Sequence, residues 1–184
     1  MVPLYILGLL QRTGPMHGYR IKKLIVEQLS DFTQIKLPTI YYHLDKMTQN
    51  GLISVEGKDS SSTRPEKTIY AITESGNHAF KQMLEETMTF SYRPTFPSDA
   101  TFFFAETLDP VALVKHLQIY AITLENSIEH IKQHEAEAMT TIPEDARPMA
   151  SIIFNHHLSH FHAEYTWVMD TLQTVGRLHA YKSC

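Results

Sequence analysis

The sequence of 184 residues contains 11 histidines, and several of them stand at helical spacing. His130 with His134, and His156 with His157 and His160, recur at intervals that place rings on one helical face, as metal ligands require. No HExxH signature and no cysteine cluster accompanies them. The alternative to a metal site is that these histidines simply lie on the surface or in an interface. There they could make dimer stability or effector response sensitive to mild acid. We therefore predict neither a metal nor another cofactor.

The sequence lacks the motifs by which enzymes are recognised. It contains no phosphate-binding glycine loop, no nucleophile elbow and no paired carboxylates on a recognisable scaffold. The single cysteine, Cys184, has no partner in the chain for a disulfide or a cysteine-based zinc site, which suits a reducing cytosol. The apolar run at 2–11 is far shorter than the roughly 20 residues of a membrane span. We expect a cytoplasmic protein that is not an enzyme and has no membrane partner.

Charge is distributed unevenly along the chain. The net charge is −4 overall, but residues 1–82 hold 10 Lys and Arg against 7 Asp and Glu (+3), which leaves 6 against 13 (−7) for residues 83–184. A basic first half joined to an acidic second half suggests that the first half faces a polyanion. Chance asymmetry between two solvated surfaces is the alternative.

A polar face on a short predicted helix, ending near Asn50-Gly51, is the best candidate for binding chemistry. Apolar residues recur from Leu37 to Met47 at intervals of 3, 4 and 3, and this core stripe turns Tyr42 and Lys46 outward. Hydroxyl, aromatic and cationic groups on one helix can contact base edges and thymine methyls of DNA, whereas a solvated polar face is the alternative. The candidate DNA-binding residues at and near this helix are Lys36, Thr39, Tyr41, Tyr42, His43 and Lys46.

The elements around this helix must position it. Amphipathic helices are predicted before Gly14-Pro15 and at 17–29, strands at 52–57 and 67–73, and a fourth helix capped by Thr73, with Gly76 where a capping box would have Glu. Three helices, a hairpin and a further helix are the order of a winged helix-turn-helix domain. Arg64 and Lys67, in or beside the hairpin loop, are candidates for contact with the DNA backbone or minor groove, although a charged hairpin tip is often simply solvated.

The second half of the chain predicts two long helices. Asp109-Pro110 is a helix start, and the final helix keeps a 4-3 apolar spacing from Phe154 to Val175. Two such helices could cover each other, but the pair leaves another apolar face, and a homodimer is the simplest way to bury it. The predicted dimer interface comprises Leu117, Tyr120, Leu124, Leu158, Phe161, Tyr165, Val168 and Leu172.

The sequence therefore predicts a mainly α protein with a small β hairpin. A winged helix-turn-helix domain occupies 1–89, a junction rich in proline 90–98, and a helical dimerisation domain 99–184. Phe103, Phe104 and Trp167 are candidates for lining an effector pocket where the domains meet, although most such aromatic residues belong to an ordinary core.

Four motifs in the first 85 or so residues resemble the PadR family of bacterial regulators. They are ILGLL at 6–10, GPMHGYRIKKLI at 14–25, IYYHLDKMTQNGLI at 40–53 and RPEKTIYAITESG at 64–76. The length and periodicity of the second half resemble the subgroup with an extended C-terminal helical domain. Tyr42 stands where the family commonly has Pro, and Glu66-Lys67 supplies one charge where it often has a basic pair. These departures leave the DNA target open.

The resemblance implies a homodimeric winged-helix regulator that binds an inverted-repeat operator. Family members are usually repressors, some are activators, and many respond to phenolic acids or other aromatic compounds. His17 lies in the family's HGY motif and is therefore added to the candidate DNA contacts. A helical regulatory protein that acts through protein partners is the alternative, but it leaves the basic winged domain unexplained.

Overall fold

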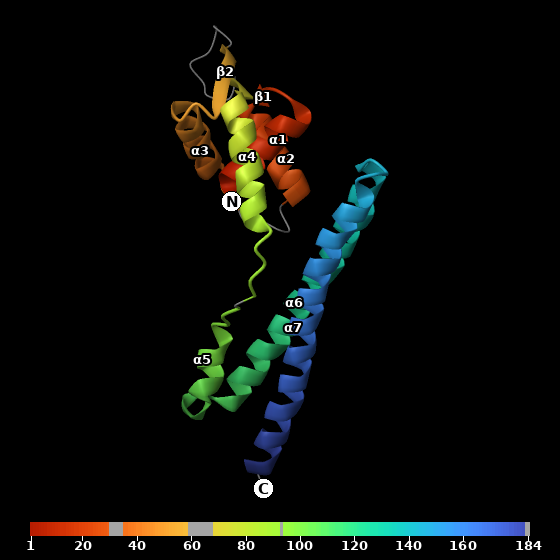
Figure 1. Ribbon diagram of the computed structural model, residues 1–184. Helices are drawn as coiled ribbons and strands as arrows, with labels where there is room; N and C mark the ends of the chain where they lie inside the picture. Colours follow the sequence, from red (N-terminus) through yellow and green to blue (C-terminus); the bar gives the residue numbers. More distant parts are fainter. Residues whose placement is uncertain (30–34, 59–67, 93, 183–184) are drawn as a thin grey trace. The chain divides into compact units, whose positions relative to one another are not determined.

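The structure of the chain, a computed structural model, describes residues 1–29, 35–58, 68–92 and 94–182. It divides into two compact units, Met1–Arg93 and Pro94–Cys184 (Figure 1). The division falls inside the segment 90–98 that the sequence assigns to a junction. Within the described ranges, no helix combines the length and apolar character needed to span a bilayer.

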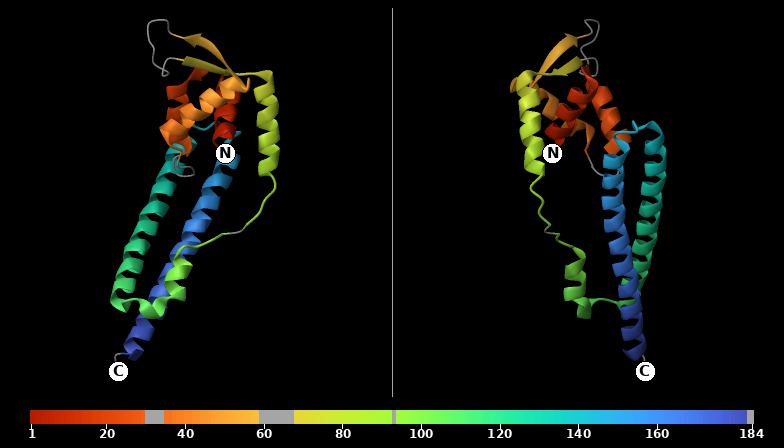
Figure 2. Two further views of the ribbon diagram at one scale, coloured as in Figure 1. Left: turned by 90° about the vertical axis from the view of Figure 1, so that its left-hand side faces the viewer. Right: turned by 45° about the vertical axis from the view of Figure 1, so that its right-hand side comes forward.

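In its described residues, the N-terminal unit contains four helices and a three-stranded antiparallel sheet at one end (Figure 2). The sheet order is β1-β3-β2, so the predicted hairpin is confirmed and a third, short strand is added to it. Two residues show no periodicity, which is why the sequence does not predict β1. The elements are α1 (Val2–Thr13), β1 (Met16–His17), α2 (Gly18–Leu29), α3 (Leu37–Gln49), β2 (Ile53–Lys58), β3 (Thr68–Ile72) and α4 (Glu74–Thr87).

One apolar core holds the N-terminal helices and the sheet together. Each helix contributes residues spaced three or four apart, as the sequence pattern predicts, and β2 and β3 contribute Ile53 and Tyr70. Full burial of each large aliphatic side chain stabilises the unit by about 1.5–3 kcal/mol. The fully buried side chains of this core are Ile6, Leu7, Leu10, Ile21, Ile25, Ile40, Leu44 and Ile53.

The start of α4 is fixed against the chain segment that leads into β2. The Thr73 hydroxyl oxygen accepts a hydrogen bond of 3.0 Å from the Gly76 amide, which confirms the predicted N-cap. The amide of Thr73 donates to the carbonyl oxygen of Leu52 at 3.1 Å. A Cβ at Gly76 would stand 2.0 Å from that same oxygen, so only glycine allows this approach.

The C-terminal unit is built on two long helices that run antiparallel. It comprises α5 (Ser98–Phe103), the short 3₁₀ helix η2 (Ala105–Thr107), α6 (Pro110–Thr141) and α7 (Arg147–Lys182). Both views in Figure 2 show α6 and α7 side by side, joined by the turn at 142–146. The Asp109 carboxylate caps α6 by accepting hydrogen bonds from the amides of Val111 at 3.1 Å and Ala112 at 3.3 Å, as predicted.

The apolar seam of α7 finds a partner within the chain. Leu117 and Leu124 of α6 and Val168 of α7 are all less than a tenth exposed, and Phe161, Tyr165 and Leu172 pack against them. The two helices therefore cover each other along this seam, which is one of the two arrangements that the sequence allows. The apolar character of these residues is explained by the helix pair, and their contact with a second copy stays a prediction.

Candidate nucleic-acid interface

The helices α2 and α3 pack closely where α2 begins, at Gly18. A Cβ at Gly18 would lie 2.9 Å from Cε1 of Tyr41 and 3.2 Å from Cδ1 of Leu44. Together with the buried Ile40 and Met47, this contact fixes one face of α3 against the core. The opposite face is consequently held in a defined orientation and remains available to a ligand.

The exposed face of α3 carries an aromatic ring beside a cationic side chain. Tyr42 is 60% exposed, and its ring meets the imidazole of His43 edge to face at 5.2 Å between centroids. The ammonium nitrogen of Lys46 lies 6.0 Å from the centre of the Tyr42 ring. The phenol, imidazole and ammonium groups thus form one surface, which offers hydrogen-bond donors, an acceptor and a cation to DNA.

The electrostatics of this surface favour an anion. Partial burial lowers the pKa of His43 below its ordinary value, and the nearby positive charges of Lys46 and of the chain's amino terminus lower it further. A phosphate group brought to the same place would offset both positive charges and favour the protonated imidazole. Burial is the larger cause of the lowered pKa of His43, and the two positive charges near the imidazole are its further causes.

The remaining predicted contacts of the N-terminal unit are less uniform. Lys36 is exposed at the N-cap of α3, and Thr39 is half-buried in its first turn. Tyr41 is half-buried against the core, so its ring is less accessible than that of Tyr42. His17 is exposed on β1, where it pairs with Ile69 of β3 and not with α3. Arg64 and Lys67 lie outside the described residues.

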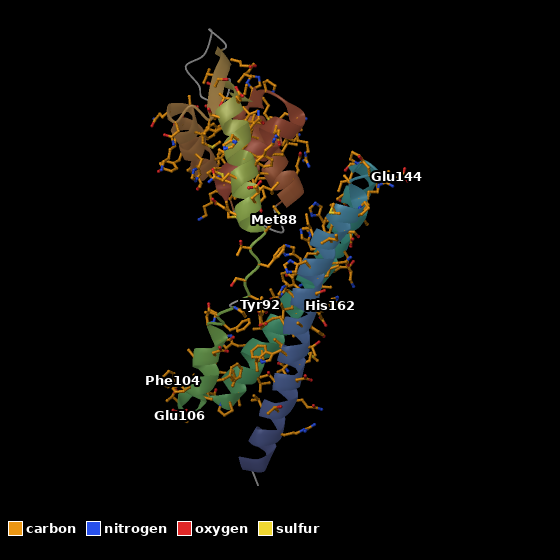
Figure 3. The ribbon with its side chains drawn as sticks, viewed as in Figure 1. Met88, Tyr92, Phe104, Glu106, Glu144 and His162 are labelled. Atoms are coloured by element: carbon orange, nitrogen blue, oxygen red, sulfur yellow. The ribbon has the colours of Figure 1, made fainter. Side chains whose placement is uncertain are left out.

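The three aromatic residues predicted to line a pocket are not packed together as expected. Phe103 and Phe104 are 78% and 55% exposed and pack edge to face on each other at 4.8 Å. Phe104, labelled in Figure 3, follows the last residue of α5. The ring that meets Trp167 is Phe102, at 5.5 Å between centroids. Sequence alone does not reveal which of three consecutive phenylalanines turns toward the helix pair.

Among the described residues, three hydrogen bonds between side chains join α6 to α7, and none of them was predicted from the sequence. The Ser151 hydroxyl donates to Oε1 of Glu135 at 3.4 Å. The Tyr120 hydroxyl donates to Oε1 of Glu164 at 3.1 Å, and the Tyr165 hydroxyl donates to Oε1 of Glu125 at 2.5 Å. Both tyrosines were predicted to lie in a dimer interface. Their glutamate partners could have been suspected only after the antiparallel register of the two helices was known.

These features define a winged helix-turn-helix protein with an added helical hairpin. Residues 6–82 match the model of the Transcriptional regulator PadR-like family. Over these residues the chain is similar to the PadR-like family. The Negative transcriptional regulator PadR of Bacillus subtilis is 37% identical over 79 residues, which are 43% of this chain and 42% of that protein. The match thus spans less than half the length of this curated relative.

Solved structures extend the similarity of fold to both units. PadR of Bacillus subtilis in complex with operator DNA has a TM-score of 0.75 at 21% identity, over 94% of this chain and 98% of its own. The virulence activator AphA of Vibrio cholerae also has a TM-score of 0.75, at 17% identity, over 97% and 99% of the two chains. PadR of Bacillus subtilis in complex with p-coumaric acid has a TM-score of 0.72 at 20% identity, over 96% of this chain and 99% of its own.

Proposed function

We propose that this protein is a DNA-binding transcriptional regulator whose α3 enters the major groove. The observation that carries the proposal is the exposed face of α3, with Tyr42 and Lys46 at its centre, on a helix whose other face is fixed by the core. In winged helix-turn-helix domains the corresponding second helix of the motif reads base edges. Lys36 at the start of α3 is suited to a phosphate, which sets register without reading sequence.

The relatives support a more specific assignment. A homodimer binding an inverted-repeat operator fits the PadR-like fold, because two symmetric subunits present two recognition helices to two half-sites. We propose repression, because the Bacillus subtilis relative is named a negative transcriptional regulator. Activation is the alternative, because the Vibrio cholerae protein is named an activator. A small aromatic effector is proposed because that Bacillus subtilis protein was solved with p-coumaric acid.

The test begins with DNA fragments selected from a random pool by the purified protein. Affinity for the selected duplex is then measured by fluorescence anisotropy at physiological salt. We expect Tyr42→Ala to weaken specific binding by about 1–3 kcal/mol, or about 5- to 150-fold, through loss of a base contact. Tyr92→Ala is the matched control, since this exposed tyrosine lies beyond the end of α4 and should leave affinity unchanged.

Two outcomes would contradict the proposal. Equal operator affinity of a folded Tyr42→Ala variant and the parent would remove this ring from the interface. Failure to enrich any sequence would favour the alternative of a regulator that acts through protein partners. The effector is tested by adding p-coumaric acid to the protein–DNA complex, where release of the duplex is expected and unchanged anisotropy would exclude this compound.

A further inference from the structure

A pair of histidines on α7 has a geometry that the proposed DNA-binding function does not use. His156 and His160 are both exposed and lie one helical turn apart. Their Nε2 atoms approach to 3.1 Å, with the ring centroids 4.7 Å apart and the ring planes at 81°. The two nitrogens that can accept a metal ion therefore lie close together beside the helix.

The separation of these nitrogens matches the span of two ligands on one metal ion. With metal–nitrogen bonds of about 2.0–2.1 Å, two ligands at a tetrahedral angle would be about 3.3–3.4 Å apart, and two at a right angle about 2.8–3.0 Å. The observed 3.1 Å lies between these values. Without an ion, the same approach can be a hydrogen bond if one ring donates and the other accepts. An ion bound by both nitrogens would replace that shared proton.

We propose that His156 and His160 form a two-histidine chelate for a late first-row divalent metal ion such as Ni²⁺, Cu²⁺ or Zn²⁺. Imidazole nitrogen is a preferred ligand of these ions, whereas Mg²⁺ and Ca²⁺ prefer oxygen. In the part of the chain that the structure describes, no group of three or more metal-binding side chains occurs. The ion would thus have two protein ligands, and water would occupy its other positions.

Chelation at this spacing requires a helix. The two rings meet because residues four apart lie on the same face of α7, and an unfolded chain does not hold them together. An ion that binds only the folded form stabilises it according to its concentration relative to its dissociation constant. The C-terminal unit is therefore expected to gain thermal stability as such an ion is added. This inference rests on the geometry of α7 and is independent of DNA binding.

The experiment uses the full chain without a histidine tag, because a tag would bind the same ions. Thermal unfolding is followed by circular dichroism with NiCl₂ or MgCl₂, and Ni²⁺ binding is measured by calorimetric titration. Ni²⁺ should raise the unfolding midpoint, EDTA should reverse the rise, and Mg²⁺ should not reproduce it. A midpoint that does not respond to Ni²⁺ would overturn the proposal.

Single substitutions assign the site. His156→Ala and His160→Ala should each lower Ni²⁺ affinity roughly tenfold or more, since each removes one of two ligands. His162→Ala is the matched control: His162, labelled in Figure 3, is also exposed on α7 but lies about 200° around the helix from His160. Comparing the Ni²⁺-dependent shift within each variant corrects for any change in basal stability. Unchanged affinity in the first two variants, or an equal loss in the control, would place Ni²⁺ elsewhere and overturn the proposal.

Discussion

Gly76 is a residue whose type is dictated by one contact. The carbonyl oxygen of Leu52 would stand 2.0 Å from an added Cβ, and this oxygen already accepts the amide hydrogen bond of Thr73. Relief of the clash must therefore move the start of α4 away from β2. We expect Gly76→Ala to lower the free energy of unfolding by about 3 kcal/mol, at the upper end of overpacking effects. Urea denaturation followed by circular dichroism measures the change.

The matched control is a glycine that has room for a side chain. Apart from its chain neighbours and the nearby backbone of its own helix, no atom lies within 4 Å of a Cβ built at Gly176, which is in α7 and has no positive φ. Gly176→Ala should therefore stabilise its helix by about 0.5–1 kcal/mol, because alanine loses less backbone freedom on folding. A Gly76→Ala protein as stable as the parent would show that α4 and β2 separate without cost.

Single residues also mark the limit of prediction from sequence. Thr73 and Asp109 were identified as helix caps because capping depends on residues within one turn. The requirement for Gly76 was not identified, since the atom it avoids belongs to Leu52, on a different element. Contacts between residues distant in sequence need the fold before they can be recognised.

At the scale of elements, the pairing of α6 with α7 includes a tyrosine–carboxylate contact that should respond to alkaline pH. Burial raises the pKa of Tyr120, and the negative charge and hydrogen bond of Glu164 raise it further. A raised pKa favours the neutral phenol in the folded state. Its contribution to stability is thus complete below the unfolded pKa of about 10 and is lost as pH rises through the folded value.

We expect Tyr120→Phe to reduce the loss of thermal stability above about pH 10, because the phenol that must ionise is absent. At neutral pH the cost should stay below about 1 kcal/mol, since the contact is partly exposed. Glu164→Gln is the companion variant, because it removes the charge while retaining an amide oxygen as acceptor. An alkaline transition of Tyr120→Phe identical to that of the parent would exclude this contact as a source of the sensitivity.

Periodicity explains which elements the sequence could predict. The helices α1, α2, α3, α4, α6 and α7 and the hairpin of β2 and β3 all repeat apolar residues at spacings typical of their class. Neither β1 nor α5, with two and six residues, is long enough to show such a repeat. The exposed face of α3 was predictable because its core stripe is regular. His17 was included on a motif alone, and the structure places it on another element.

At the scale of the whole molecule, an apolar repeat does not identify its partner. The heptad of α7 predicts that a helix packs against it, and a helix of the same chain or of a second copy would satisfy that requirement equally. The structure shows that α6 packs against Val168 within one chain. Surfaces for a second copy must therefore be sought among apolar residues that this packing leaves exposed. On α7 these include Met149, Ile152 and Ile153, at 67%, 60% and 46% exposure.

Folding of the helix pair can be separated from the proposed homodimerisation by two substitutions on α7. Val168 is 0% exposed, so Val168→Asp would place an unpaired charge in the core between α6 and α7. Helical content should fall in that variant. Ile152 is exposed in the single chain, so Ile152→Asp should leave circular dichroism unchanged and weaken contact with a second copy.

Sedimentation of the Ile152→Asp protein should then show a shift from dimer to monomer. Operator affinity should fall with it, because one half-site held alone loses the effective concentration that the dimer supplies for the second. Lys132→Ala is the control, because Lys132 is an exposed residue of α6. This variant is expected to sediment as the parent does. If Ile152→Asp remains a dimer of unaltered operator affinity, this face of α7 lies outside the interface and another exposed surface joins the two copies.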